Sequence, residues 1–207
     1  IKSTWSRLES DAFNGPAKEI FTRHSKLIAE VLELVKHVSD SSNLTLDPEL
    51  DSFSIKEAIV TLLPQMVENL GQARGMSSGL AVRKLVTTQE SIKLTSLLST
   101  VQKNIDALKR GMQVLSQSNQ QLSNKIGSQV KRTISGAENY LSFLETEILN
   151  ADEINVQSST VFSKGTTTIK ANFSILDMLA PEMSTLLELR IEGLYSNLTL
   201  FPSLLFF

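Results

Sequence analysis

The sequence predicts an all-α protein, an elongated antiparallel helical bundle, from two observations. Apolar residues recur every three or four positions along most of the chain, which is the period of a helix face, and few stretches alternate as strands do. Polar segments rich in Ser, Asn, Asp and Gly separate these periodic stretches. We therefore expect long helices joined by polar connectors.

Composition supports a folded domain and argues against some partners. Of the 207 residues, 41% are hydrophobic and 20% are charged, which is typical of a folded protein. The 20 Lys and Arg residues against 22 Asp and Glu residues give a net charge of −2, without the basic excess that nucleic-acid binding requires. The chain has no cysteine, which excludes disulfides and thiolate metal sites.

The first periodic segment predicts a helix that ends near residue 38. Its apolar seam advances in steps of four and three residues, which is the spacing of a coiled-coil face. The seam consists of Ile20, His24, Leu27, Val31, Leu34 and Val38. Residues 5–12 extend the pattern backward past Pro16, which either kinks the helix or starts a new turn. We expect His24 to be a packed histidine, and we expect no metal site.

Residues 39–53 predict the end of this helix, a connector and the start of the next helix. Ser, Asn and Asp side chains compete there for backbone hydrogen bonds, and Pro48 disfavours a helical conformation of the preceding residue. Either Ser52 or Ser54 is expected to cap the next helix, and Glu57 would complete a capping box with Ser54.

The longest periodic segment spans residues 89–149 and forms either one helix of about 90 Å or two helices. Its seam runs through Leu94, Leu98, Val101, Ile105, Leu108, Met112 and Leu115. We place the break or bend within residues 116–127, where Ser, Gln and Asn are dense. The last helix carries apolar residues from Ile169 to Leu194, with a kink expected at Pro181.

The predicted helices differ greatly in length, which bears on the architecture. Two stacked helical modules accommodate unequal helices better than a simple four-helix design does, so we expect this bimodular arrangement. A single four-helix bundle is the alternative.

Several strings of the first half carry a family resemblance. Ser-Asn-Leu-Thr-Leu-Asp-Pro-Glu-Leu-Asp-Ser-Phe ends at Phe53, Leu-Pro ends at Pro64, and Leu-Gly-Gln-Ala-Arg-Gly ends at Gly75. Together they resemble the extracytoplasmic sensor region of bacterial methyl-accepting chemotaxis proteins and related transmembrane signalling receptors. The resemblance covers residues 5–83, and the remainder matches only in its helical pattern.

The resemblance implies a function and a location. Residues 1–200 would form a periplasmic sensor domain that binds a small solute, usually as a homodimer, and passes a helix displacement across the bacterial inner membrane. One transmembrane helix would precede residue 1, and a second would start within residues 201–207. The sequence contains no phosphate loop, nucleophile elbow or zinc motif, so we expect neither an enzyme nor a cofactor.

Arg74 is the first candidate for ligand binding, because its guanidinium offers five donors to a carboxylate or another oxyanion and glycines flank it. Gln72 and Asn69 would add amide contacts, and Arg83 would make the approach basic for an anionic solute. Arg74 could instead form an interhelical salt bridge or serve as a charge at a helix end, and Arg83 could instead belong to a solvated basic face.

Two other functions remain open from the sequence alone. The same sensor could belong to a histidine kinase or a diguanylate cyclase, because output modules are exchanged independently of the sensor. The chain could also be a structural coiled-coil assembly protein, with the seam between Leu94 and Leu115 as its oligomer interface.

Overall fold

The computed structural model describes residues 1–11, 14–44 and 48–204, and within these the side chains of all residues except 17–18 and 197–204. The described residues form helices and turns without a β-strand, which confirms the all-α class. The α-helices are α1 (Lys2–Asp11), α2 (Ala17–Ser41), α3 (Leu50–Glu57), α4 (Leu63–Arg83), α5 (Thr88–Ser118), α6 (Gln120–Leu144) and α7 (Ser158–Leu204). Two π-helical turns, η2 (Ala58–Leu62) and η3 (Glu145–Leu149), complete the elements.

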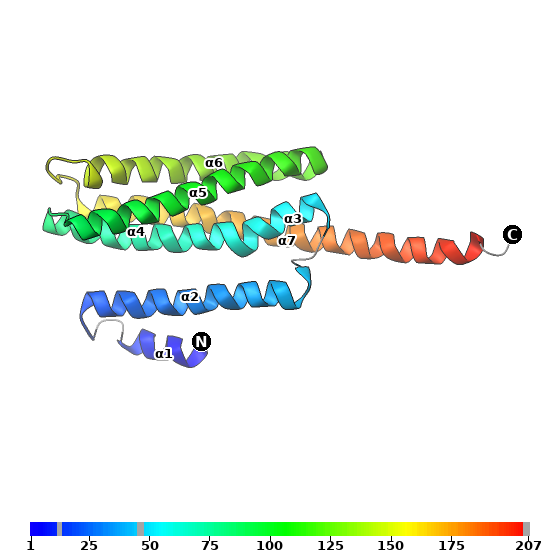
Figure 1. The fold of residues 1–207 in the computed structure, drawn as a ribbon, viewed down its shortest axis with the longest axis horizontal. Helices are drawn as coiled ribbons and strands as arrows, with labels where there is room; N and C mark the ends of the chain where they lie inside the picture. The colour runs from blue at the N-terminus through cyan, green and yellow to red at the C-terminus, as the bar shows by residue number, and fades with distance from the viewer. Residues whose placement is uncertain (12–13, 45–47, 205–207) are drawn as a thin grey trace.

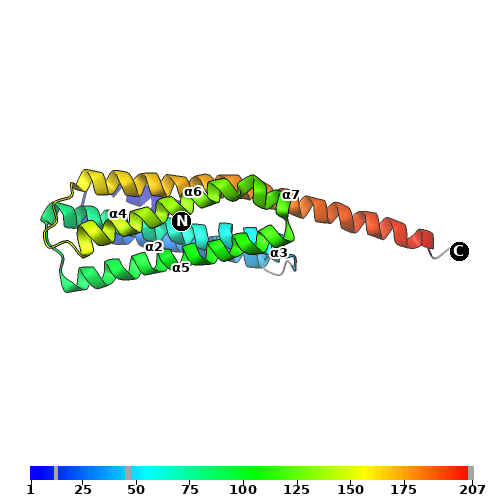
Figure 2. The same ribbon diagram turned by 90° about the horizontal axis from the view of Figure 1, so that it is seen from above.

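The helices from α3 to α7 form one elongated four-helix bundle (Figure 1). Three segments, α3, η2 and α4, follow one another as a single rod, and α5, α6 and α7 are the other three rods. They pack in the cyclic order α4, α5, α6, α7, and successive rods run in opposite directions (Figure 2). One continuous core of buried apolar side chains joins all four. The single-bundle alternative therefore describes the structure, and the expected arrangement of two stacked modules is corrected.

The break predicted within residues 116–127 is confirmed at Asn119. Its backbone leaves the helical region, with φ −147° and ψ 81°, and its side chain accepts a hydrogen bond from the amide of Leu122 at 3.0 Å, which caps α6. The chain reverses direction there, so α5 and α6 lie side by side. Because of this reversal, residues 89–149 bury their seam within the chain's own core.

The first helix expected from the sequence is two helices. Pro16 precedes α2 at its N-terminus, and α1 folds back beside α2 to form a hairpin on the outside of the bundle (Figure 1). Leu27 is 5% exposed, but the seam residues Val31, Leu34 and Val38 are 37%, 47% and 55% exposed. The apolar face of α2 is therefore only partly covered by the chain itself. The predicted end of this helix near residue 38 agrees with the end of α2 at Ser41.

The start of α3 differs from the prediction. The helix begins at Leu50, so Ser52 and Ser54 lie inside it, and their hydroxyls donate to the carbonyls of Glu49 and Leu50 at 3.2 and 2.8 Å. Neither serine is a cap, and the expected capping box with Glu57 does not form. The connector residues 45–47 lie outside the described part of the chain.

Pro64 explains the π-helical turn that precedes α4. A proline within a helix has no N–H to donate, and its ring clashes with the carbonyl four residues earlier. The wider turn of η2 covers the residues just before Pro64 and lets the rod continue from α3 into α4.

The last helix, α7, is the longest, with 47 residues, or about 70 Å. It continues through Pro181, so the proline does not end it. Its first part lies in the bundle, and its last part extends beyond the end of the bundle (Figures 1 and 2). Residues 191–196 are exposed on every side. Of the expected second membrane helix at 201–207, residues 205–207 lie outside the described residues.

Candidate functional site

All four candidate ligand residues lie on α4, but the helix turns them to different sides. Gln72 and Arg83 face a groove between α2, α4 and the start of α5. Arg74 faces α7 on the opposite side, where it contacts Thr166. Asn69 does not line the groove, and its amide donates to the carbonyl of Gln65 one turn earlier at 2.7 Å. The four residues therefore do not form one site.

The groove is open and has a volume of about 800 Å³. Gly75 and Gly79 of α4 line it. A Cβ atom on Gly79 would meet no atom within 4 Å, whereas one on Gly75 would lie 3.2 Å from the Phe21 ring of α2. The side chains that give it its chemistry are Phe21 of α2, Gln72 and Arg83 of α4, and Gln89, Glu90 and Lys93 of α5. Two cations and one carboxylate in this set leave a net positive charge.

Arg83 is held at the groove by the turn between α4 and α5. Its Nη2 donates to Oε1 of Glu90 at 2.5 Å. Glu90 also accepts from the amide and hydroxyl of Thr87 at 3.1 and 2.9 Å, and its own amide donates back to Thr87 in a capping box. The bond from Arg83, followed by the bonds from Thr87, lowers the pKa of Glu90 from 4.5 to about 2. The sequence carries the signal Thr-x-x-Glu for this capping box, which sequence analysis missed.

Gln72 is bonded within α4 and still reaches the groove. Its Nε2 donates to Oε1 of Glu68 one turn earlier at 2.6 Å. The amide oxygen of Gln72 is an acceptor, and its second N–H is a further donor. Gln72 is thus oriented by its neighbour and retains polar atoms that a solute in the groove could contact.

Arg74 joins α4 to α7 by two contacts. Its Nη1 donates to the Thr166 hydroxyl at 2.8 Å, and its guanidinium carbon lies 4.4 Å from the centre of the Phe162 ring, a cation–π distance. Its Nε is buried without a hydrogen-bond partner among the described residues. No carboxylate of the described residues pairs with Arg74, so the alternative role of an interhelical salt bridge is not what the structure has.

Gly165 allows the close approach of α7 to this arginine. A Cβ atom there would lie 2.6 Å from the Tyr140 hydroxyl and 2.8 Å from Cγ of Arg74. Tyr140 donates to the carbonyl of Val161 at 3.3 Å, and burial raises the pKa of this tyrosine. Sequence analysis missed Tyr140, Phe162 and Thr166, because only the pairing of α6 and α7 with α4 brings them to Arg74.

A second polar cluster lies where α7 leaves the bundle. Arg190 of α7 forms an ion pair with Asp51 of α3 and donates to the hydroxyl of Ser52 at 2.5 Å. Asn119, at the turn between α5 and α6, donates to the other oxygen of Asp51 at 3.1 Å. The side chains of Arg190 and Asp51 are 25% and 16% exposed. These residues connect three of the four rods. The sequence singled out only Ser52 among them, and as a helix cap, so the cluster itself was not predicted.

His24 makes its contacts within the α1–α2 hairpin. Nδ1 of His24 lies 2.8 Å from the carbonyl of Ile20, and its ring meets Trp5 edge to face at 6.5 Å. His24 is therefore a packed residue of the hairpin. Within residues 1–11, 14–44 and 48–204, no group of three His, Asp or Glu side chains could hold a metal ion.

Comparisons with protein-family models, with curated proteins and with solved structures find no match. Among the described helices, none is both long enough and apolar enough to cross a membrane.

Proposed function

We propose that this chain is the periplasmic ligand-sensing domain of a bacterial inner-membrane receptor, of the kind that methyl-accepting chemotaxis proteins carry. The observation that carries the proposal is α7, which is packed inside the bundle and then continues out of one end as the same helix. A helix of this kind can pass a displacement of 1–2 Å from one end to the other. The receptor would thereby report that a solute is bound.

The groove is the proposed site for the solute. The end of α4 and the start of α5, which line it, lie at the end of the bundle away from the exit of α7 (Figure 1). Gln72, Arg83 and Lys93 offer donors and positive charge there. A small anion or a zwitterion, such as an amino acid or an organic acid, fits this chemistry. Its open shape and mixed lining favour a small polar solute over a large apolar one.

Helix α4 is the proposed link between the groove and α7. One side of α4 carries Gln72 and Arg83, and the other side carries Arg74, which contacts Thr166 and Phe162 of α7. A solute can shift an equilibrium only if it binds the two arrangements with different affinity. The buried Nε of Arg74 has no hydrogen-bond partner among the described residues. The α4–α7 contact therefore leaves one donor unsatisfied in this arrangement.

The exposed seam of α2 supports the proposed homodimer. Val31, Leu34 and Val38 lie on one side of α2 and are each more than one third exposed. Pairing this face with that of a second copy would remove it from water. The rival proposal of a coiled-coil spacer has less support, because the seam of α5 is buried inside the chain and is not available to a partner. Which output module the receptor carries does not affect the sensor proposal.

A solute screen tests binding. The purified 207-residue chain is heated with amino acids, C4 to C6 organic acids and inorganic anions. A solute at a hundred times its Kd should stabilise the chain by about 2.7 kcal/mol. Gln72→Ala combined with Lys93→Ala should abolish this shift, and Thr95→Ala, exposed on α5 outside the groove, is the control. A screen without any hit, or a hit that the double variant keeps, would refute the groove as the site.

A distance measurement tests signalling. Because the chain has no cysteine, spin labels can be attached at Ser128→Cys on α6 and Glu192→Cys on α7 without background. The solute should change the mean distance between them by about 1–2 Å, while a pair at Ser96→Cys and Ser128→Cys within the bundle stays constant. Arg74→Gln should bind the solute and lose the change. Binding with unchanged distances in the unmodified sequence would contradict the sensor proposal.

A further inference from the structure

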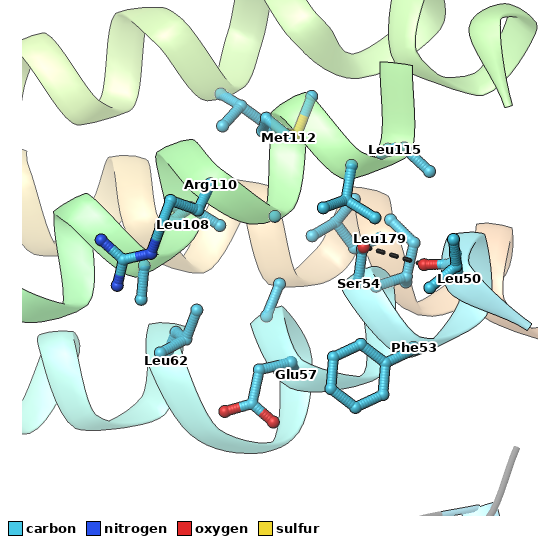
Figure 3. A pocket seen from close by; sticks show the side chains of 16 residues that line it. Leu50, Phe53, Ser54, Glu57, Leu62, Leu108, Arg110, Met112, Leu115 and Leu179 are labelled. Atoms are coloured by element: carbon cyan, nitrogen blue, oxygen red, sulfur yellow. Dashed lines mark hydrogen bonds between the residues drawn. The ribbon is translucent and has the colours of Figure 1, made fainter. Parts of the chain in front are cut away.

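An apolar cavity lies at the other end of the bundle, between α3, η2 and α5 (Figure 3). Its volume is about 260 Å³. Ile55 and Ala58 form one wall, Ala107 and Gly111 form the facing wall, and Val130 and Leu179 lie across the bundle on α6 and α7. Val130 and Leu179 are each 1% exposed. The cavity therefore reaches from the surface to the centre of the core.

Small residues on facing helices explain the cavity. Ala58, Ala107 and Gly111 stand where larger side chains would fill the space between η2 and α5. Protein cores are packed so closely that few voids exceed a water molecule, so a cavity of this size is unusual. A Cβ atom built on Gly111 meets no atom within 4 Å, which shows that the space is available to further atoms.

The polar groups around the cavity are either paired or at its mouth. The Ser54 hydroxyl donates to the carbonyl of Leu50 at 2.8 Å, and Glu57 pairs with Lys56 at 3.6 Å. Arg110 is exposed, and Figure 3 shows its charged end directed away from the apolar side chains near Leu179. None of the described buried polar atoms that lack a partner belongs to the lining. A charged ligand would therefore find no partner inside.

We propose that this cavity binds a small uncharged apolar molecule, about the size of a substituted benzene ring. An apolar cavity of about 150 Å³ is enough for benzene, so 260 Å³ leaves room for a small substituent. Phe53 lines the cavity and is 45% exposed, which places its ring where the cavity meets the surface. This site is separate from the groove at α4, and the inference does not depend on the proposed sensor function.

Toluene is the probe for the test, with the purified 207-residue chain. Calorimetric titration should give saturable binding at one site, and benzoate, which adds a charge to the same ring, should bind at least tenfold more weakly. Absence of toluene binding would overturn the proposal. Equal affinity for benzoate would overturn the apolar class of ligand.

Two glycine variants locate the site. Gly111→Leu fills the cavity and should weaken toluene binding at least tenfold. Gly136→Leu on α6, where an added Cβ also meets nothing within 4 Å, is the matched control and should bind as the unmodified chain does. If Gly111→Leu fails to fold, Gly111→Ala adds one methyl group at the same place and should weaken binding at least twofold. Unchanged affinity in the folded Gly111 variant would overturn the site.

Discussion

Two helices of this protein, α5 and α2, have the same apolar spacing and different surroundings. On α5, Leu94, Val101 and Ile105 are each 0% exposed. On α2, Val31, Leu34 and Val38 are between 37% and 55% exposed. A seam with steps of three and four residues thus indicates a helix and its apolar face, but it does not say whether the partner of that face belongs to the same chain.

The largest expected difference between the two seams is in stability. Ile105→Ala leaves a cavity in the core and should lower the free energy of unfolding by about 3 kcal/mol. Leu34→Ala removes a half-exposed side chain and should change it by less than about 0.5 kcal/mol at low protein concentration. Urea denaturation of both variants gives the comparison. Equal losses would mean that α2 is packed as tightly as α5.

One ion pair of the bundle and one of the hairpin should differ in their contribution to stability by a smaller amount. Asp51→Asn leaves Arg190 partly buried without its carboxylate and should cost about 2 kcal/mol, less than a fully buried pair. Asp11→Asn removes the Asp11–Arg23 pair of the hairpin, whose side chains are 45% and 38% exposed, and should cost less than about 0.5 kcal/mol. Denaturation midpoints of the two variants test this order, and a larger loss for Asp11→Asn would reverse our view of which pair holds the fold.

Self-association tests whether a second copy covers α2. Leu34→Glu places a charge in the exposed seam and should weaken a dimer at least tenfold, or about 1.4 kcal/mol, with little change in monomer stability. Analytical ultracentrifugation measures the dissociation constant, and Glu33→Gln on the same helix is the control. An unmodified chain that stays monomeric at high concentration would refute the proposed α2 interface.

The smallest effect is expected at the turn between α4 and α5. The pKa of Glu90 is about 2 in the folded chain against 4.5 as its ordinary value, so its contribution to stability is present above pH 4.5 and is lost as the pH falls toward 2. Glu90→Gln should flatten the pH dependence of stability in this range, measured by thermal melting. Thr87→Ala, which removes the hydroxyl bond to the Glu90 carboxylate and the cap on the Glu90 amide but keeps the bonds from Arg83 and from the amide of residue 87, should flatten it less. An unchanged profile in both variants would mean that Glu90 is not held as the structure has it.

The helices were largely predictable, and their pairing was not. Apolar spacing predicted the helices, and clustered polar residues located the end of α2 near residue 38 and the break within 116–127, because both signals act locally. The choice between one bundle and two modules depended on whether Asn119 ended the helix and reversed the chain. The start of α3 was misplaced because serine also bonds to carbonyls within a helix, as Ser52 and Ser54 do.

For the candidate site, the sequence predicted only which segment carries the four residues. Sequence analysis placed all four ligand residues on one segment, which became α4. Helical spacing alone places Gln72 and Arg83, eleven residues apart, on one face and Arg74 on the opposite one. What each face meets depends on the packing of α2 and α7, which no local pattern shows. The cluster at Asp51 joins residues 139 positions apart in the sequence, and no local pattern reveals such a contact.

The uninterrupted course of α7 fixes the angular phase of the part that extends beyond the bundle. Each residue of a helix advances the chain by 1.5 Å and turns it by about 100°. One residue inserted within 191–196 would therefore swing every side chain beyond it to another quadrant, while lengthening the rod by little more than a bond. A change in the number of residues therefore alters the direction of the side chains at this end of α7 far more than it alters the length of the helix.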